Sequence, residues 1–359
     1  MDSSDPDLIL DEYGVCNWCR SFDSIATRHM IRDSTKLQTL ISEIKLDGQG
    51  KTYDCVQGIS GGTDSSYTAW TAHKLGLRVL LLHWDNGYDD PRATENIKRI
   101  VDQTGFDIRY ESVDFDEFRD LQLAYLKSGV IDIEVPTDHA ITALTYGTAA
   151  KLKVKYLLSG SNMATEAIQP KAWGYRKFDL RNLKDIHRKF GGRKLAKFPT
   201  MGTIGLLWHL YIHRIRQVSI LNYLNYNRET AKQKLRQECG WQDYGLKHFE
   251  SIYTRFYQAY ILPTRFGVDK RRSHLSSLIN SGQITREEAL AQLERPPLDS
   301  TQLERDRQYI LAKLGLSEDQ FEELMRLPIR RHSDFKTDEY VYSVLHKGRH
   351  LIRGLMSAL

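Results

Sequence analysis

The sequence has little of what marks a secreted or membrane-spanning chain. Its 359 residues include 4 cysteines, which do not suggest the disulfide framework of a small secreted domain. The longest apolar run, 204–212, contains His209 and is too short to cross a bilayer. The N-terminus lacks the basic and then apolar segments of a secretory signal. These absences predict a cytoplasmic protein without a membrane span.

A strong excess of one charge is also missing. The formal net charge is +5, and basic residues gather at 184–197, 270–272 and 330–331. Such clusters are usually solvated surface, although they can contact the phosphates of a nucleotide, a nucleotide-sugar or RNA. We therefore do not expect nucleic acid to be the main partner.

Two common phosphate motifs are absent, the Gly-Lys-Ser/Thr of a Walker loop and the G-x-G-x-x-G of a dinucleotide site. A different glycine-rich loop lies between an expected strand at 52–59 and an expected helix at 65–75. Its glycines let backbone N–H groups approach an anion, while hydroxyls and the helix N-terminus add donors and positive charge. The alternative is a Gly/Ser turn without a ligand. The predicted phosphate cradle consists of Ser60, Gly61, Gly62, Thr63, Asp64, Ser65 and Ser66. Asp64 is its natural first ligand for Mg²⁺.

Strands and helices alternate from residue 52 onward, which predicts an α/β fold with a parallel sheet flanked by helices. Strands are expected at 52–59, 77–84, 107–113 and 154–159. Helices are expected at 24–46, 65–75, 91–104, 115–127, 138–152, 205–218 and 227–239. We expect three segments: a cysteine-bearing element and helix at 1–48, the nucleotide-binding domain at 49–262, and a helical C-terminal region at 263–359. A capping box is predicted to begin at Thr285.

Ligands of parallel sheets bind at the carboxyl ends of the strands, where two more polar loops are expected. Asp85 follows the second strand and could bind ribose or help to hold Mg²⁺, unless 85–87 is only a turn. The loop after the fourth strand is expected to touch the α-phosphate or the acceptor, and Glu166 in it is a candidate acceptor contact or magnesium ligand. The candidate contacts in this loop are Ser159, Gly160, Ser161, Asn162 and Glu166.

Three further residues, Thr137, Asp138 and His139, precede an expected helix. They are candidate substrate contacts, and Thr137 or Asp138 could equally be the N-cap of that helix. Near the N-terminus, Cys16 and Cys19 look like half of a zinc ribbon. A structural zinc site needs four ligands, and no second Cys-x-x-Cys exists in the chain.

The S-G-G-x-D-S pattern at 60–66 resembles the pyrophosphate loop of the ATP pyrophosphatases. That superfamily includes asparagine synthetase, GMP synthetase, NAD synthetase and the tRNA-thiolating enzymes. The resemblance implies a PP-loop domain at 49–262 that uses ATP and Mg²⁺ and cleaves ATP between its α- and β-phosphates. It also implies that a late lysine reaches the departing pyrophosphate, where preorganised cations lower the barrier. The candidates are Lys270 and Arg271 as catalytic residues and Arg272 as an ATP contact.

Longer matches resemble one subgroup, the N-acetyl sugar amidotransferases of bacterial surface-polysaccharide and flagellin-glycan synthesis. They cover roughly residues 3 to 298, at 60–66, 83–87, 134–140, 159–166, 173–175 and 249–276. The resemblance implies a ligase-type reaction in lipopolysaccharide O-antigen or related glycan synthesis. The amide oxygen of a sugar N-acetyl group would be adenylylated by ATP, and ammonia would then displace AMP and leave an acetamidino group.

The source of ammonia is not in this sequence. Cys239-Gly-Trp does not match the nucleophile elbow of a class I glutaminase, and the N-terminal cysteine of a class II glutaminase is absent. The resemblance therefore implies two partners, a glutaminase subunit and a cyclase-like barrel similar to those of imidazole glycerol phosphate synthase. Family members also carry an earlier Cys-x-x-Cys ahead of the segment that matches 2–7. We accordingly expect a start assigned too late or a lost N-terminus, which puts the zinc site of this polypeptide in doubt.

Two alternatives remain open. A tRNA sulfur transferase of the same superfamily would explain Cys16 and Cys19 and the basic clusters, and predicts salt-sensitive RNA binding and a cysteine pair near the ATP site. A non-catalytic ATP-binding module would keep the phosphate loop without needing the acceptor contacts of 159–166 or the cations of 270–272.

Overall fold

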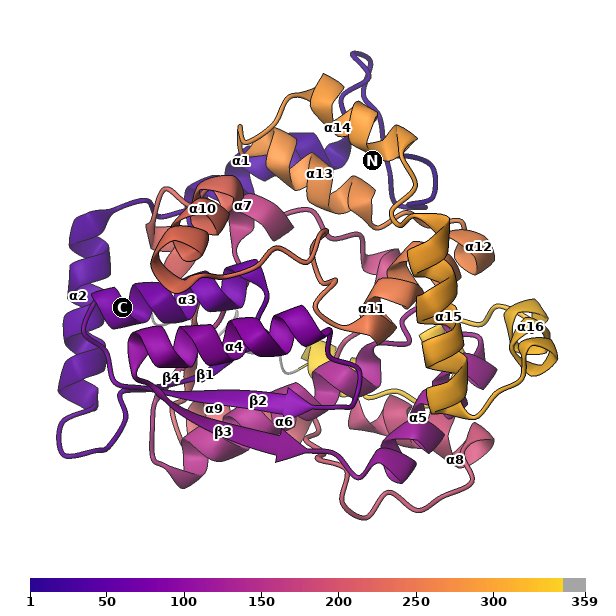
Figure 1. Ribbon diagram of the computed structural model, residues 1–359, viewed down its shortest axis with the longest axis horizontal. Coiled ribbons are helices and arrows are strands. Elements are labelled where there is room, and N and C mark those ends of the chain that lie inside the picture. Colours follow the sequence, from indigo (N-terminus) through magenta and orange to yellow (C-terminus); the bar gives the residue numbers. More distant parts are fainter. Residues whose placement is uncertain (345–359) are drawn as a thin grey trace.

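The computed structural model describes residues 1–344 and is built around a parallel sheet (Figure 1). The strand order is β3-β2-β1-β4-β5, and every neighbouring pair is parallel. The strands are β1 (Cys55–Gly58), β2 (Val79–Asp85), β3 (Asp107–Ser112), β4 (Tyr156–Leu158) and β5 (Arg216–Val218). The predicted α/β architecture is therefore confirmed, and the carboxyl ends of all five strands meet at one edge of the sheet.

Helices cover both faces of this sheet and make up most of the chain after it. They are α1 (Asn17–His29), α2 (Ser34–Asp47), α3 (Thr63–Lys74), α4 (Pro91–Thr104), α5 (Phe115–Ser128), α6 (Val135–Lys151), α7 (Met163–Glu166), α8 (Leu180–Phe190), α9 (Thr203–Tyr211), α10 (Arg228–Cys239), α11 (Ile252–Phe256), α12 (Leu262–Phe266), α13 (Arg271–Asn280), α14 (Arg286–Glu294), α15 (Ser300–Leu314) and α16 (Glu318–Arg326). Short 3-10 turns lie at Lys171–Trp173, Ile220–Tyr223 and His332–Asp334, and a π-helical turn at Tyr257–Ile261. Among the residues described, no helix has both the length and the apolar character that a membrane crossing requires.

The two faces of the sheet follow from the two-residue period of its strands. In β2, Leu81 packs with α2, α3, α4 and α10, whereas Leu80 and Leu82 pack with α6 and α9 on the other face. Both sets are apolar, as expected for a sheet covered on both sides. Figure 1 shows α3 and α4 on one side of the sheet and α6 and α9 on the other.

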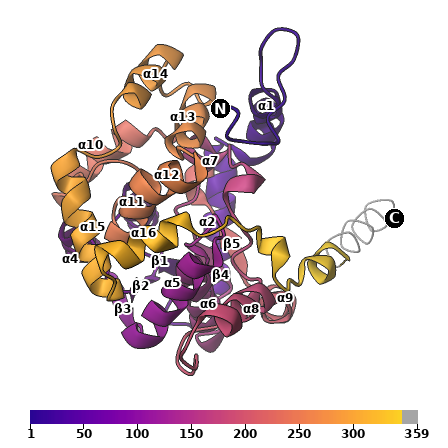
Figure 2. The same ribbon diagram turned by 90° about the vertical axis from the view of Figure 1, so that its right-hand side faces the viewer.

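A second core joins the C-terminal helices to the α/β part. Phe321 of α16, Phe256 of α11 and Tyr125 of α5 are buried in it together. Arg255 is 3% exposed and bonds both Asp90, the N-cap of α4, and Asp306 of α15. These contacts place α15 and α16 beside α5 and α11 (Figure 2). The edge of the sheet that carries the phosphate loop is thereby held by elements from both halves of the chain.

Two expected helices differ from the structure. The helix predicted at 24–46 is two helices, because the chain turns at Arg32, with φ of 44°, and Asp33 caps a new helix start. The helix predicted at 205–218 ends at Tyr211, and residues 216–218 pair with β4 as a short edge strand. The capping box at Thr285 is confirmed, whereas the division into three segments stays a prediction.

Candidate functional site

The phosphate loop is the turn from β1 into α3. Gly61 has φ of 74°, and a Cβ there would lie 2.1 Å from the carbonyl oxygen of Ala93. Only glycine fits so close an approach in the left-handed region. Gly62 is the N-cap residue of α3, so the first N–H groups of the helix face the loop, where an anion would be stabilised.

The loop forms one wall of a cavity of about 200 Å³. Eight predicted residues line it: Ser60, Gly62, Thr63, Asp64, Ser65, Gly160, Ser161 and Glu166. Five residues that the sequence reasoning did not select complete it: Arg228, Tyr244, Lys247, His248 and Glu250. The expected meeting of the loops after β1 and β4 is therefore observed, with α10 and the loop between α10 and α11 closing the cavity.

Two donors that line this cavity have no partner within the part of the chain that the structure describes. Thr63 Oγ1 and Arg228 Nε are buried and make no hydrogen bond. Unpartnered buried donors are costly, and an anion is the ligand that would satisfy both. Tyr244 shapes the loop by accepting, on its hydroxyl, a hydrogen bond of 3.1 Å from the N–H of Thr63. The residues present thus fit a phosphate group.

Lys247 lies between the two sheet loops. Its ammonium donates to Asp64 Oδ2 at 2.5 Å, to Thr165 Oγ1 at 2.7 Å and pairs with Glu166 Oε1 at 2.7 Å. Burial opposes its charge, but the two carboxylates outweigh it and raise the pKa of Lys247. The lysine is therefore a fixed cation, 9% exposed, at the point where the phosphate loop meets the loop after β4.

Asp64 is held from two sides. It accepts hydrogen bonds from Lys247 and from the hydroxyl of Tyr226. Burial by itself would raise the pKa of Asp64, but Lys247 and Tyr226 lower it below its usual value, so the carboxylate stays charged. Residues 1–344 contain no cluster of three or more His, Cys, Asp or Glu suited to a metal. Mg²⁺ bound here would take Asp64 as its protein ligand, with phosphate oxygens and water supplying the rest of its shell. Glu166, which pairs with the same lysine, lies in the loop after β4 and stays a candidate for either the acceptor or Mg²⁺.

Other predicted residues shape the site rather than line it. The carbonyl of Gly61 accepts from Trp241 Nε1, and Ser159 Oγ accepts from the N–H of Ser161. Asn162 is fully buried and caps α7, with its Oδ1 accepting from the N–H of Thr165. Asp85 is outside the cavity and accepts from the N–H of Gly87, as a turn residue does.

The three basic residues at 270–272, at the start of α13, have different surroundings in the structure. Arg271 bonds Asp269 and the carbonyl oxygens of Gln292 and Arg295 at the end of α14. Arg272 pairs with Asp2. The positive charge of Lys270, in contrast, lowers the pKa values of His248 and His274 beside the cavity. Lys270 therefore acts on the site through its charge without lining the cavity, whereas Arg271 and Arg272 join neighbouring segments.

A second polar cluster lies at the start of α6, where substrate contacts were predicted. Lys177 pairs with Asp132 at 2.6 Å and with Asp138 at 3.1 Å. Glu134 accepts from Thr254 on one oxygen, and burial, followed by the charge of Asp138, raises the pKa of Glu134 to about 7. Its other oxygen is buried and, within residues 1–344, has no partner.

Thr137 and His139 belong to the same first turn of α6. His139 is 1% exposed, donates from Nδ1 to the carbonyl of Lys177 and accepts on Nε2 from the N–H of Met201. Burial lowers its pKa. The structure therefore gives His139 a packing position, and Thr137 and Asp138 remain the more accessible candidates. Neither is the N-cap, which is Glu134 and makes no side-chain cap bond.

The cysteine pair stands apart from the cavity. Cys16 caps α1, and its sulfur lies 3.4 Å from that of Cys19. Asn280 of α13 donates to Cys19. No third ligand joins them among the described residues, and the predicted zinc site is accordingly not supported, since two thiolates do not complete a tetrahedral site.

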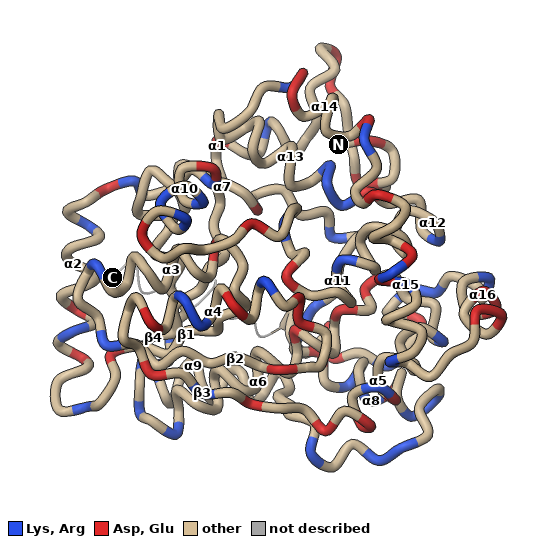
Figure 3. The backbone as a smooth tube through the Cα atoms, viewed as in Figure 1, with Lys and Arg blue, Asp and Glu red and all other residues tan. Residues whose placement is uncertain are grey.

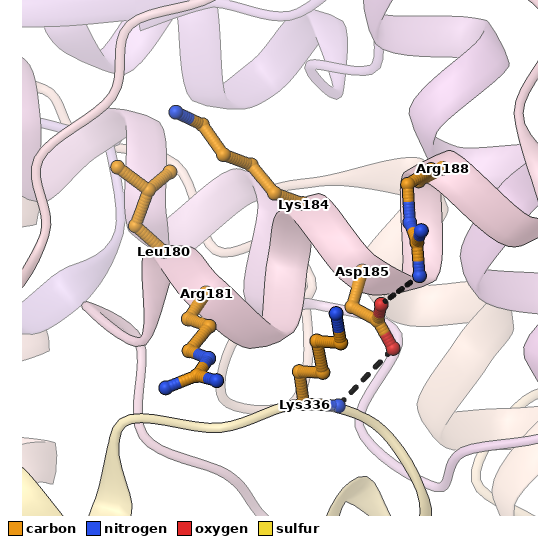
Figure 4. Close-up of a pocket in the computed structure, with 6 residues that line it drawn as sticks. All are labelled: Leu180, Arg181, Lys184, Asp185, Arg188 and Lys336. Atoms are coloured by element: carbon orange, nitrogen blue, oxygen red, sulfur yellow. Dashed lines mark hydrogen bonds and ion pairs between the residues drawn. The ribbon is translucent and has the colours of Figure 1, made fainter.

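The basic cluster at 184–197 also lies away from the phosphate loop. Part of it borders a cavity of about 480 Å³ beside α8, where Asp185 accepts from Arg188 and from the N–H of Lys336 (Figure 4). No residue of the phosphate loop lines this cavity. Basic and acidic segments are interspersed along most of the backbone (Figure 3), which is typical of a solvated surface.

These features define a class: an α/β protein in which a glycine-rich loop joins the first strand of a parallel sheet to a helix N-terminus, beside a buried lysine. Within this chain, residues 250–349 match the family model described as "LPS biosynthesis protein WbpG-like, C-terminal domain". This match covers the C-terminal part of the chain, and the phosphate loop lies outside it. No curated protein matches the chain.

Three solved structures share parts of the fold at low similarity. A predicted subunit of tRNA methyltransferase from Methanocaldococcus jannaschii is 13% identical over 50% of this chain and 74% of its own, with a TM-score of 0.29. NMN synthetase from Francisella tularensis is 13% identical over 57% and 93%, with a TM-score of 0.31. NH3-dependent NAD synthetase from Campylobacter jejuni is 15% identical over 79% and 97%, with a TM-score of 0.31. Identities and TM-scores this low carry no information about the site, whose assignment rests on its own geometry.

Proposed function

We propose that this protein is an ATP-dependent, AMP-forming amidotransferase that converts the N-acetyl group of a sugar into an acetamidino group. The observation that carries the proposal is the cavity in which the phosphate loop and the loop after β4 meet around Lys247. One wall suits the phosphates of ATP, and the other presents Glu166 to an acceptor. The match of residues 250–349 to a lipopolysaccharide biosynthesis family supports a sugar acceptor.

The phosphate wall suits cleavage between the α- and β-phosphates. Backbone N–H groups at the start of α3 and the hydroxyl of Thr63 would bind phosphate oxygens. Lys247 and Arg228 supply positive charge where the departing pyrophosphate gains negative charge. Mg²⁺, when bound through Asp64, would neutralise further phosphate charge. The protein's contribution is to position the reactants and to fix these charges in advance.

The acceptor wall is formed by the loop after β4, and we place the amide oxygen of the N-acetyl group on this side. Attack of that oxygen on the α-phosphate turns a poor leaving group into a good one, AMP. Ammonia then forms the new carbon–nitrogen bond while the carbon–oxygen bond to AMP breaks. The polar cluster of Asp132, Asp138 and Lys177 at the start of α6 supplies groups suited to sugar hydroxyls.

Ammonia is proposed to come from a glutaminase subunit through a cyclase-like barrel, as the family resemblance implies. In the test, excess ammonium would replace these partners. The protein is incubated with ATP, Mg²⁺, ammonium and a panel of N-acetylated nucleotide-sugars, and the products are identified by mass spectrometry. AMP, pyrophosphate and a sugar lighter by about one mass unit, as expected when NH replaces oxygen, would support the proposal.

Other outcomes would replace it. AMP formed with tRNA, and with none of the sugars, would favour the thiolation alternative, although no cysteine lines the cavity among the described residues. ATP binding without AMP formation, with every acceptor and with a glutaminase added, would favour a non-catalytic module.

A further inference from the structure

Two histidines lie together on the acceptor side of the cavity. His248 lines the cavity, and its ring centre is 5.4 Å from that of His274, which belongs to α13. The Nε2 of His248 is 3.8 Å from Glu166 Oε1. This distance is longer than a hydrogen bond, so Glu166 does not hydrogen-bond to His248. His274 Nε2 is buried and has no hydrogen-bond partner in residues 1–344. The phosphate-binding role of the cavity uses neither ring.

Both rings are held in the neutral form. Burial, followed by the positive charges of Lys247, Lys270 and Arg228, lowers the pKa of His248 well below its usual value. The pKa of His274 is lowered in the same way by burial, by His248 and by the two lysines. A neutral imidazole keeps one nitrogen lone pair as a hydrogen-bond acceptor. Three acidic side chains line the same cavity as His248. Asp64 and Glu166 are paired with Lys247, and burial raises the pKa of Glu250.

The acceptors at this wall suit a small neutral nitrogen compound. The carboxylates of Asp64 and Glu166 are already paired with the ammonium of Lys247, so a second cation would have to compete with that lysine, whereas neutral ammonia would not. Ammonia needs acceptors for its N–H groups, and the imidazole lone pairs and Glu166 supply them. It also needs room, and the His248 side chain lines the cavity and is 37% exposed.

We propose that the wall formed by His248, His274 and Glu166 is the ammonia-binding site of this enzyme, and that His248 accepts the proton that the attacking nitrogen must lose. The inference rests on the proposed function and adds the site of the second substrate to it. His274 acts as a positioning residue, because it packs against the ring of His248 and its hydrogen bond to the backbone of Thr165 ties it to the acceptor loop.

The step balances without another reactant. The nitrogen lone pair of ammonia forms a bond to the activated amide carbon while the π pair of its C=N bond moves to the sugar nitrogen, and the attacking nitrogen becomes positively charged; the same π pair re-forms the C=N bond when AMP leaves. The attacking nitrogen passes one proton to the free ring nitrogen of His248. The carbon–oxygen bond then breaks, and its electron pair leaves with AMP, whose phosphate charge compensates the protonated ring. The amidine keeps the new carbon–nitrogen bond, and His248 returns its proton to solvent.

The test separates the two half-reactions in His248→Asn. Asparagine tolerates the left-handed backbone of this position, where φ is 65°, so we expect the variant to fold. The first half-reaction is followed as acceptor-dependent exchange of labelled pyrophosphate into ATP, and the second as amidine formation at a fixed concentration of free ammonia. We expect amidine formation to fall by about 10²-fold and exchange to fall far less. His29→Asn, at an exposed position of α1, is the matched control and should change neither.

The pH profile is the second readout. In the wild type, amidine formation at constant free ammonia should rise with pH as a single group loses its proton, and His248→Asn should lack this rise. Equal loss in both half-reactions, or wild-type amidine formation in His248→Asn, would overturn the assignment. If His248→Asn does not fold, His248→Gln is measured in the same way. Absence of pyrophosphate exchange in the wild type would refute the proposed function instead, so the two failures are distinguishable.

Discussion

Lys247 and Asp64, which are 183 positions apart in the sequence, form an ion pair of 2.5 Å in the wall of the phosphate cavity. The same ammonium lies 2.7 Å from Glu166, so one side chain joins the phosphate loop to the acceptor loop. Because all three groups are largely buried, the pair also fixes how far apart these loops lie. A phosphate that entered the cavity would meet a cation already held in position.

Lys247→Met removes this cation and should reduce AMP formation by about 10²-fold or more, since preorganised charge at a departing group contributes on that scale. The measurement is acceptor-dependent AMP release, with folding checked by circular dichroism. Lys98→Met, at an exposed position of α4, is the control. AMP release at the wild-type rate from folded Lys247→Met would remove this lysine from the mechanism.

Asp64→Asn keeps the shape of the side chain and removes its charge, so we expect AMP formation to be lost while the fold remains. The control is Asp85→Asn, which was a candidate from its place after β2 and which caps its own turn outside the cavity. We expect the Asp85 variant to keep the wild-type KM for ATP. If Asp85→Asn loses AMP formation and Asp64→Asn keeps it, the nucleotide lies across the end of β2 and not over the phosphate loop.

The phosphate loop could be predicted from the sequence because its signal is local. Ser60–Ser66 carries the glycines, the hydroxyls and the helix start within a few positions, and a strand precedes it. The strands β1, β2 and β4 follow for the same reason, since each is a short buried run between turns, whereas β3 is polar and is marked by its place between two predicted helices. β5 has an exposed Arg216 and Gln217 and only three residues, so its pairing with β4 is a tertiary effect.

Lys247 could not be found in that way. It lies in the loop between α10 and α11, where no periodic pattern marks a site, and it reaches Asp64 only through the fold. The block at 270–272 attracted attention by its density of charge, yet Arg271 and Arg272 use their charges on Asp269 and Asp2. Charge density along a sequence does not say which partner a side chain will meet.

Mutations of Lys270 and Arg271 should therefore have different effects, one on AMP formation and the other on stability. Arg271→Met breaks bonds to Asp269 and to the end of α14 and should lower the free energy of unfolding by about 1–3 kcal/mol, with turnover per folded molecule unchanged. Lys270→Met removes a charge that acts on His248 and His274 beside the cavity and should slow AMP formation with a smaller effect on stability. Urea denaturation and AMP release, measured on both variants, check this, and the reverse result would contradict the placement.

Gly61→Ala tests the close approach in the loop. The new Cβ would collide with the carbonyl of Ala93, so both stability and ATP binding should fall. Gly282→Ala is the matched control, because its φ of 73° is equally left-handed and nothing lies within 4 Å of the added Cβ. We expect the control to cost about 1 kcal/mol of unfolding free energy and Gly61→Ala distinctly more. Equal costs would mean that the loop can move away from α4.

Glu134 gives a pH dependence of known sign. Its pKa is raised from 4.5 to about 7 by burial and then by Asp138, so the unfolded chain loses this proton at lower pH than the folded protein. The contribution of Glu134 to stability is therefore greatest below pH about 4.5 and declines as pH rises to about 7. Glu134→Gln cannot ionise and removes that decline.

The measurement is the free energy of unfolding of wild type and Glu134→Gln across this range. From the lower to the upper end of this pH range, the free energy of unfolding of the variant should rise relative to the wild type by up to about 3 kcal/mol. Each pKa unit corresponds to a fixed free-energy difference between the two protonation states. Glu294→Gln, at an exposed position of α14, should follow the wild-type curve. Parallel curves for wild type and Glu134→Gln would show that Glu134 is charged in the folded protein. Its unpartnered oxygen would then have to face a cation or water.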